Sequence, residues 1–530
     1  MSQELRRQAL TVIQPGFEGT TPPGWLRRQL ARGLGGVCLF ARNTPDPGTT
    51  ARLTAALRAE NPRALIAADE EGGAVTRLES AHGSRWPGNG ALGRAGDPEL
   101  TRAVAAEMGA FAAAAGIGLV YAPTADVTSD PRNPVIGIRS FGVSAPDVAA
   151  HTAAFVAGMQ SAGVAACAKH FPGHGDTTVD SHHDLPVLRV DAHTLRHREL
   201  LPFRAALEAG VRTVMAGHLL IPCLDPHRPA SLSRPVLTGL LREQLGFQGA
   251  VVTDALEMDA VAGGEPLPAL AVRALAAGAD LLCLGARRTD EETVLAVRDA
   301  LVTAVQVGEL PASRLADAAA RVLAVALPRP AAALAATPGA ADGEAPYGAV
   351  LGALAARRAL ELTGEVPPSA AAPVVVTFDP PPSVAVGRRT PWGVAALVAA
   401  RVPGTEQVTL TPDTCDDAGL APALAHPGRP LVLVVRDAAR HPWITAAVEK
   451  VLARRPDAGV VEMGLPGAVR PGAWHLATYG PSLASARAAV ALLYGDGGSG
   501  SSGGNGSNGS ADEGCGGTAG GSTPSELPPA

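Results

Sequence analysis

The chain has 530 residues, of which 46% are hydrophobic and 18% are charged. This composition excludes a largely disordered chain and is that of a globular protein with room for about two to four domains. Its 44 basic and 50 acidic residues give a formal net charge of −6. Such a balance gives no reason to expect a nucleic acid or an anionic membrane as a partner.

The cysteines and the N-terminal segment bear on the cellular compartment. The six cysteines lie far apart and form no CxxC pair, so the sequence indicates neither a disulfide framework nor a zinc ribbon. Residues 1–16 lack the apolar stretch and the small-residue cleavage site of a secretory signal, and no segment has the character of a membrane span. We therefore expect a cytoplasmic protein.

Residues 1–330 repeat one pattern, in which a short apolar run ends in polar residues and is followed by an Ala/Leu/Arg-rich helical stretch. The eight apolar runs are residues 9–14, 35–40, 64–71, 118–127, 165–171, 212–218, 249–256 and 279–285. Short apolar strands that alternate with helices are typical of parallel β/α units, and eight such units predict a closed (β/α)8 TIM-like barrel. Reactive groups of this fold lie at the carboxyl ends of the strands. The residues that the pattern places there are Asp69, Glu71, Asp126, Lys169, His170, His218 and Asp254.

The rest of the chain divides into three parts. A linker at 331–372 contains a helical stretch at 347–362. Residues 373–494 again alternate apolar runs with helical patterns, which predicts a smaller open α/β domain with a parallel sheet. Residues 495–530 are rich in Gly and Ser and too poor in apolar side chains to offset the entropy of ordering. We expect them to form a disordered, flexible tail.

The segment 169–186, KHFPGHGDTTVDSHHDLP, is the densest polar stretch and holds four of the 13 histidines. Its early Pro and Gly residues permit a sharp turn that brings its later half over the mouth of the barrel. Asp180 and His182 are two residues apart, close enough for the carboxylate to orient the imidazole and raise its basicity. The pair is an acid/base dyad in outline.

Lys169 begins this segment and is one of only two lysines among the 44 basic residues, the other being Lys450. A chain that uses Arg almost everywhere else indicates that an ammonium group is needed here. Its compact charge and three donors suit a cluster of sugar hydroxyls better than a planar guanidinium does. A chance lysine at a strand end is the alternative.

Other strand ends carry further charged residues. Asp254 ends the seventh predicted strand, where a carboxylate can attack an electrophilic carbon or simply cap a helix. Asp69, Arg77 and Arg139 can bind hydroxyl or carbonyl groups of a ligand, or form structural salt bridges. The GxGxxG pattern at 88–93 follows no apolar strand, so we discount a dinucleotide site.

These motifs together resemble the glycoside hydrolase family 3 β-N-acetylhexosaminidases, the NagZ-like group. The resemblance covers residues 10–330. In the same order along the chain, the shared motifs are DxEGG at 69–73, NPVIGxRSFG at 133–142, KHFPGHGDTxxDSH at 169–182, and a strand ending in Asp with a downstream Met at 251–258. The resemblance implies a (β/α)8 barrel independently of the strand count.

Residue by residue, the resemblance makes Asp254 the nucleophile and His182 the general acid/base, with Asp180 as the partner of His182. The positions that correspond to sugar binding are Asp69, Arg77, Arg139, Lys169 and His170. A histidine thus takes the place of the second carboxylate that retaining glycosidases ordinarily use. Imidazole has an unperturbed pKa of about 6.5, so it can protonate a leaving oxygen and later accept a proton from water.

Two positions depart from the pattern of this group. Ala255 stands where an acid commonly follows the nucleophile, and Glu70 stands where Gln is common. Neither position is one of the implied catalytic residues, but the first can alter the electric field at Asp254. The predicted domain at 373–494 fits two-domain members of the family, whereas the Gly/Ser tail is not a family feature.

The sequence therefore predicts a retaining exo-glycosidase that removes terminal β-linked GlcNAc from peptidoglycan fragments and needs no metal or organic cofactor. Its partner is a small carbohydrate, either a GlcNAc-containing muropeptide or a chitooligosaccharide. Phosphorolysis in place of hydrolysis and a catalytically silent sugar-binding protein stay open as alternatives. A third alternative is a metal-dependent hydrolase with His170, His174, Asp180 and His182 as ligands.

Overall fold

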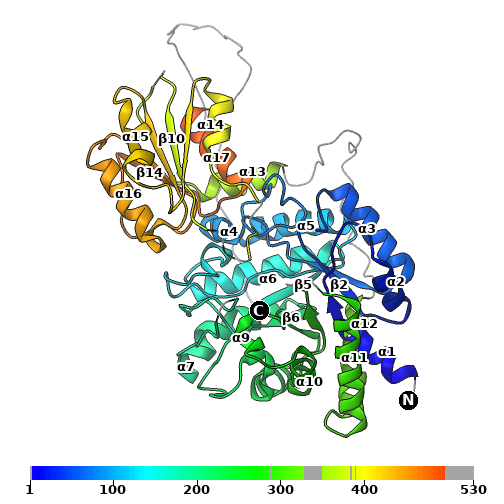
Figure 1. The fold of residues 1–530 in the computed structure, drawn as a ribbon. Coiled ribbons are helices and arrows are strands. Elements are labelled where there is room, and N and C mark those ends of the chain that lie inside the picture. Colours follow the sequence, from blue (N-terminus) through cyan, green and yellow to red (C-terminus); the bar gives the residue numbers. More distant parts are fainter. Residues whose placement is uncertain are drawn as a thin grey trace, which may run out of the picture. The chain divides into compact units, whose positions relative to one another are not determined.

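Eight short strands alternate with helices over residues 13–326 of the computed structural model (Figure 1). The strands are β1 (Ile13–Pro15), β2 (Gly36–Leu39), β3 (Leu65–Ala68), β4 (Leu119–Val120), β5 (Ala165–Phe171), β6 (Thr213–Ala216), β7 (Ala250–Thr253) and β8 (Leu282–Leu284). Each strand overlaps one of the eight apolar runs, so the predicted β/α repeat is confirmed. The structure describes residues 3–182, 184–285, 289–326, 349–369, 371–381, 383, 385–387 and 390–495.

The eight strands form two parallel ladders. Strands β2 to β7 pair in chain order, and β1 pairs with β8. A parallel bridge between Val252 and Leu281 connects β7 to the residue before β8. Within the described residues no ladder joins β1 to β2, so the closed barrel stays a prediction although the parallel β/α architecture is confirmed.

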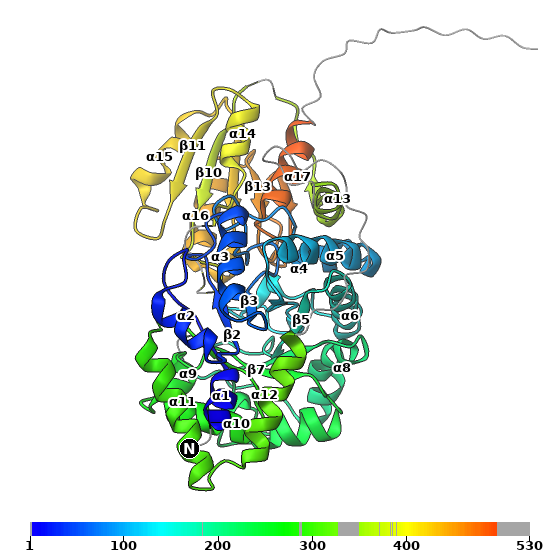
Figure 2. The same cartoon turned by 90° about the vertical axis from the view of Figure 1, so that its right-hand side faces the viewer.

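Helices connect the successive strands (Figures 1 and 2). They are α1 (Gln3–Thr11), α2 (Gly24–Ala31), α3 (Pro47–Glu60), α4 (Asn89–Ala95), α5 (Pro98–Ala114), η1 (Gly137–Arg139), α6 (Ala145–Ser161), α7 (Ala192–Thr194), η2 (Leu195–Glu199), α8 (Leu200–Glu208), η3 (Ala230–Leu232), η4 (Pro235–Gln244), α9 (Asp259–Ala262), α10 (Leu267–Ala277), α11 (Glu291–Gln306) and α12 (Ala312–Ala326). The side chains of Asp46, Asp97 and Asp290 cap α3, α5 and α11 by accepting a backbone N–H from the first turn.

Strand side chains of the first sheet alternate between two apolar layers. In β2, Val37 and Leu39 pack with the helices, whereas Cys38 between them belongs to a separate cluster on the other side of the strands. The same alternation occurs in β3, β5 and β7. Both sides of the strands are buried, which explains why they read as continuous apolar runs. Asp69 and Asp254 directly follow β3 and β7, whereas Lys169 and His170 lie among the last residues of β5.

The C-terminal part of the described chain forms a second sheet, with the strand order β11-β10-β12-β13-β14-β9. Its elements are α13 (Ala349–Ala359), β9 (Glu361–Gly364), β10 (Val374–Phe378), α14 (Ala395–Arg401), β11 (Glu406–Leu410), α15 (Asp417–Ala425), β12 (Leu431–Val435), η5 (Ala438–Arg440), α16 (Pro442–Leu452), β13 (Gly459–Glu462), β14 (Trp474–Ala477) and α17 (Leu483–Tyr494). Helices α15 and α16 cover one face, and α14 and α17 cover the other (Figure 1). All strand pairs except β14–β9 are parallel, so the predicted α/β sheet is confirmed.

Two elements of this sheet differ from the prediction. The helix predicted at 347–362 ends at Ala359, and residues 361–364 instead form β9, which pairs antiparallel with β14. Strand β11 is not predicted, because its residues form no continuous apolar run. It lies at the edge of the sheet, where partly buried residues alternate with exposed ones until the buried Leu410. Both strands depend on a neighbouring strand that is distant in the sequence.

The chain up to Gly495 groups into one compact unit, and residues 496–530 are not part of it. The predicted tail is outside the described residues, and the predicted domain boundaries stay predictions. None of the helices in the described ranges combines the length and the apolar character that crossing a bilayer requires.

Candidate active site

The carboxyl ends of the strands in the first sheet surround a pocket of about 870 Å³, counting its open mouth. Seven of the eight predicted site residues line it, namely Asp69, Arg77, Arg139, Lys169, His170, His182 and Asp254. The eighth, Asp180, is hydrogen-bonded to His182.

A network of acids and bases forms one wall of the pocket. Nζ of Lys169, near the end of β5, lies 3.0 Å from Asp69 Oδ1 and 2.6 Å from Glu71 Oε1. Arg139 donates from Nη2 and Nε to the two carboxylate oxygens of Glu71, at 2.8 and 3.0 Å. Arg77 donates to Asp69 Oδ2 at 3.3 Å. Three cations thus share two carboxylates, which leaves one positive charge in excess on this wall.

Burial and neighbouring charge act in opposite directions on these groups. Burial alone would raise the pKa of Glu71, but Arg139 and Lys169 hold it far below its ordinary value. Burial would lower the pKa of Lys169, yet Glu71 and Asp69 raise it. Burial would raise the pKa of Asp69, yet the neighbouring cations lower it. All three groups are therefore charged at neutral pH, which suits hydrogen bonding to the hydroxyls of a ligand.

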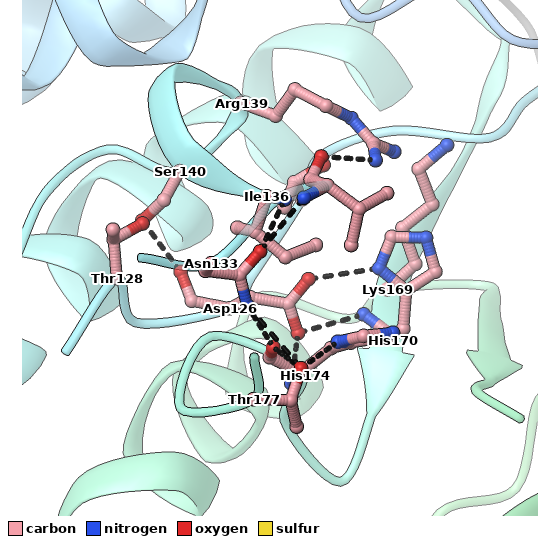
Figure 3. Close-up of polar contacts among 12 residues, drawn as sticks. Asp126, Thr128, Asn133, Ile136, Arg139, Ser140, Lys169, His170, His174 and Thr177 are labelled. Atoms are coloured by element: carbon pink, nitrogen blue, oxygen red, sulfur yellow. Dashed lines mark hydrogen bonds and ion pairs between the residues drawn. The ribbon is translucent and has the colours of Figure 1, made fainter. Parts of the chain in front are cut away.

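A second histidine–carboxylate pair lies next to this network (Figure 3). The buried carboxylate of Asp126, after β4, accepts from His170 Nδ1 at 2.8 Å. Its other oxygen accepts the backbone N–H groups of His170 and His174, at 3.1 and 2.8 Å. The sequence places Asp126 at a strand end but gives it no role. Asp126 and His170 are 44 residues apart in the sequence, so the only sequence feature that indicates their pairing is that both lie at strand ends.

Buried polar contacts around His174 hold the loop that follows β5 (Figure 3). Asn133 Nδ2 donates to the backbone oxygen of His174 at 2.8 Å, and Thr177 Oγ1 lies 2.8 Å from His174 Nδ1. Burial, and next the nearby His170, lower the pKa of His174 to about 4, so its ring is neutral at neutral pH. These contacts fix the start of the segment whose later part carries His182.

His182 and Asp180 lie together, as the sequence predicts. Nδ1 of His182 lies 2.7 Å from Asp180 Oδ1, which also accepts the backbone N–H of His182 at 2.9 Å. The two side chains are 20% and 12% exposed, so most of the pair is shielded from solvent. Because an ionised carboxylate only accepts, Nδ1 donates to it and Nε2 is the ring atom available for proton transfer.

Asp254 follows β7 and lines the same pocket as His182. Its Oδ1 accepts the N–H of Ala255 at 2.8 Å, while the Ala255 carbonyl accepts from Nε2 of the buried His218 at 3.0 Å. Burial alone would raise the pKa of Asp254, but three nearby histidines, chiefly His218, lower it below its ordinary value. The carboxylate is therefore ionised at neutral pH, as a nucleophile must be.

Ala255 replaces the acid that is common after the nucleophile, but this replacement does not remove the contacts that hold Asp254. Both contacts of residue 255 use its backbone, so they do not depend on the missing acidic side chain. Ser231 Oγ lies 2.7 Å from the other ring nitrogen of His218 and holds that ring in turn. Asp254 is thus positioned by the peptide backbone next to it.

Glu70, the second departure, is fully buried and does not line the catalytic pocket. Its Oε2 accepts the backbone N–H groups of Arg77 and Leu78 at 2.9 and 3.0 Å, which holds the loop after β3. Burial raises the pKa of this carboxyl to about 7. When protonated, Glu70 is neutral and has the shape of Gln, the residue common here in the group that the sequence resembles.

We expect Glu70→Gln to stabilise the protein above pH 7 by up to about 3 kcal/mol, because the variant never buries a carboxylate charge. The carboxyl has an ordinary pKa of 4.5 in the unfolded chain and about 7 in the folded chain. The wild type therefore loses stability as the pH rises between these values, and the advantage of the variant grows over the same window. Thermal unfolding midpoints near pH 5 and near pH 8 measure the effect. A difference that does not change with pH would contradict it.

The GxGxxG pattern lies at the start of α4 and not at a strand–helix turn. A Cβ on Gly93 would lie 1.7 Å from the carbonyl oxygen of Phe141, and one on Gly90 would lie 2.9 Å from that of Ile138. These glycines therefore let α4 pack closely against the segment 138–141.

The four residues of the metal alternative divide into two groups. The His170 ring and the His174 backbone bond to Asp126, whereas His182 bonds to Asp180. Among the residues that the structure describes, no three His, Cys, Asp or Glu side chains are placed to hold one metal ion. The described geometry therefore offers no donor set for that alternative.

Comparisons with known proteins identify relatives of this chain. Residues 27–325 match the model of the glycosyl hydrolase family 3 N-terminal domain. Beta-hexosaminidase A of Pseudoalteromonas piscicida is 37% identical over 262 residues, which are 45% of this chain and 44% of that protein. A beta-hexosaminidase of Methylococcus capsulatus is 38% identical over 250 residues, which are 47% of this chain and 74% of that protein.

A solved structure resembles nearly the whole described chain. It is a glycoside hydrolase family 3 beta-N-acetylglucosaminidase from Paenibacillus sp. str. FPU-7, with 32% sequence identity and a TM-score of 0.82. The similarity covers 93% of this chain and 96% of that one, so it extends to the second sheet. The names of these relatives favour neither a phosphorylase nor a catalytically silent protein.

Proposed function

Because this chain belongs to glycosyl hydrolase family 3, we propose that it is a retaining exo-β-N-acetylglucosaminidase that removes terminal β-linked GlcNAc from peptidoglycan fragments. The observation that carries the proposal is that Asp254 and His182 line the same pocket and that Asp180 is hydrogen-bonded to His182. The relatives named beta-hexosaminidase and beta-N-acetylglucosaminidase support the choice of sugar.

In the first step, Asp254 attacks the anomeric carbon while protonated His182 donates its Nε2 proton to the glycosidic oxygen. A glycosyl–aspartate ester forms, and the aglycone leaves as an alcohol. The lowered pKa of Asp254 keeps the nucleophile anionic in a largely buried position. Asp180 stabilises the positive charge of the imidazolium ring and fixes the tautomer.

In the second step, the now neutral His182 accepts a proton from water, and the water oxygen attacks the anomeric carbon. The attack comes from the face that the aglycone has left, and Asp254 is released as a carboxylate. Two successive inversions restore the β configuration of the sugar.

The charged wall beside these groups is suited to hold the sugar. Lys169 has three N–H donors, of which Asp69 and Glu71 take two, so one is left for a ligand hydroxyl. His170 is held by Asp126 through Nδ1, which leaves Nε2 for a second contact. Asp69 accepts from hydroxyls, because its carboxylate is charged and its side chain is 22% exposed.

Hydrolysis of nitrophenyl N-acetyl-β-glucosaminide tests the proposed function. We expect NMR spectra recorded before mutarotation to show the β-anomer of GlcNAc as the first product, because the reaction passes through a covalent intermediate on Asp254. First release of the α-anomer would contradict the retaining mechanism. Failure of the protein to hydrolyse this substrate would contradict the activity itself.

A further inference from the structure

His182 lies on the loop that follows β5, eleven residues after Phe171, the last residue of that strand. Proton transfer requires this loop to hold the imidazole ring at the glycosidic oxygen. The start of the loop is held by the buried contacts of His174 described above. Residues 178–179, shortly before the dyad, are exposed. The position of His182 therefore depends on what holds the loop between these two points.

Asp176 lies between these points and is bound by Arg198, which belongs to η2. Arg198 Nη2 donates to Asp176 Oδ2, and Arg198 Nε donates to Glu199 Oε1 at 2.6 Å. The side chains of Arg198 and Asp176 are 29% and 28% exposed, so their ion pair is partly shielded from solvent. Burial would lower the pKa of Arg198, but Glu199 and Asp176 raise it. Arg198 thus connects the loop to the buried carboxyl group next to it on η2.

The helix that carries Arg198 is packed against the strand from which the loop starts. Glu199 is buried, and η2 continues into α8, where Phe203 packs against Phe171 with the ring centroids 5.2 Å apart. A Cβ on Gly173 would lie 2.7 Å from Glu199 Oε2, so the first turn of the loop passes directly over Glu199. Arg198 therefore projects from a well-packed element, and its contact with Asp176 extends this support further along the loop.

Neither Asp176 nor Arg198 is among the described residues that line the catalytic pocket. Any effect of this pair on the reaction must therefore pass through the loop. Asp176 precedes His182 by six residues. A loop that places its catalytic group correctly for only a fraction of the time has its activity reduced by that fraction. An ion pair that fixes the middle of the loop raises the fraction.

We propose that Arg198 is a positioning residue for the general acid/base: by binding Asp176, it holds the loop so that Nε2 of His182 reaches the glycosidic oxygen. The inference rests on the proposed function and adds to it a residue from outside the pocket. In the first step a proton leaves Nε2 for the glycosidic oxygen, and in the second step a proton from water returns to Nε2. Loss of Arg198 slows both transfers but leaves the carboxylate of Asp254 in place.

Two glycosides of GlcNAc that differ only in the leaving group test this inference. Dinitrophenyl N-acetyl-β-glucosaminide releases its phenolate without a proton, whereas the unsubstituted phenyl glycoside needs a proton from His182. We expect Arg198→Gln to lower kcat/KM for the phenyl glycoside by about 5- to 30-fold, and to change the value for the dinitrophenyl glycoside by less than about 2-fold. Asp176→Asn removes the same ion pair from the loop side and should give the same pattern.

Azide provides a readout for the second step. In Arg198→Gln the dinitrophenyl glycoside should form the glycosyl–aspartate ester normally, and the attack of water should then limit kcat because it needs a base. Azide attacks without a base, so it should raise kcat of the variant and yield the β-glycosyl azide. It should change kcat of the wild type far less. A merely structural weakening of the protein predicts no such acceleration.

Further variants show whether Arg198 acts through Asp176. The double variant of Arg198→Gln and Asp176→Asn should lose no more activity on the phenyl glycoside than either single variant, because both changes remove one contact. Arg198→Lys keeps the charge and should retain more activity than Arg198→Gln. Arg196→Gln is the matched control, because Arg196 is exposed on the same helix two residues earlier and its replacement should leave both substrates unaffected.

Three results would overturn the inference. They are equal losses on both glycosides in Asp176→Asn, unchanged kinetics in both single variants, and losses that add in the double variant. If Arg198→Gln fails to fold, Asp176→Asn carries the test, because it leaves the contact between Arg198 and Glu199 in place. Absence of turnover of both glycosides by the wild type would instead overturn the proposed function, so the two failures are distinguishable.

Discussion

Asp254→Ala should lower kcat for nitrophenyl N-acetyl-β-glucosaminide by at least about 10⁴-fold, because the variant lacks the group that forms the covalent intermediate. The remaining contacts of the pocket still bind the sugar, so KM should change far less than kcat. Steady-state kinetics with the purified variant measures both constants. Undiminished turnover would exclude Asp254 as the nucleophile.

Azide provides a positive readout for the same variant. Without the Asp254 carboxylate, azide can attack the anomeric carbon from the face that the carboxylate occupied, and the product is the α-glycosyl azide. Asp259→Ala is the matched control, because it removes an exposed carboxylate five residues further along the chain. The control should retain wild-type turnover and form no α-glycosyl azide.

The gathering of most candidate site residues could be predicted because parallel strands all end at one edge of their sheet. Asp69, Lys169 and Asp254 are far apart in the sequence, yet each lies at or near the end of a strand and lines the same pocket. The pairing of His182 with Asp180 is local, since two residues separate them. The roles assigned to these groups stay predictions.

Contacts between distant side chains could not be predicted from spacing. Nothing near Asp126 in the sequence distinguishes it from other strand-end acids, because its partner His170 lies on the next strand. Likewise, Glu71 is recognisable in the sequence as an acid at a strand end. Its ion pairs with Arg139 and Lys169 could not be predicted, because the fold brings them together from three separate segments.

The second sheet shows a similar limit at the level of topology. Its central strands β10, β12 and β13 are buried on both faces and are recognisable as apolar runs, whereas the edge strands β9 and β11 are defined by their neighbours. The reversal of strand order between β10 and β12 follows from the pairing and not from any local pattern.

Glu71→Gln should destabilise the protein by about 3 to 5 kcal/mol at neutral pH, because it leaves two buried cations short of a carboxylate. Glu71 and Arg139 are 3% and 7% exposed, and Lys169 is 2% exposed. After the change, Asp69 alone faces Lys169, while Arg139 has only neutral acceptors. The variant should also lose activity, because Lys169 and Arg139 line the pocket.

The pH dependence of this loss distinguishes an ion pair from simple packing. The pKa of Glu71 is lowered on folding, so its contribution is complete above the ordinary value of 4.5 and is lost as the pH falls toward the folded value. The stability gap between wild type and variant should therefore shrink in acid. Glu60→Gln is the control, because Glu60 pairs with Arg27 at the surface, where an ion pair contributes less than about 1 kcal/mol. Equal losses of stability in the two variants would show that the buried ion pairs of Glu71 stabilise the protein no more than a surface ion pair does.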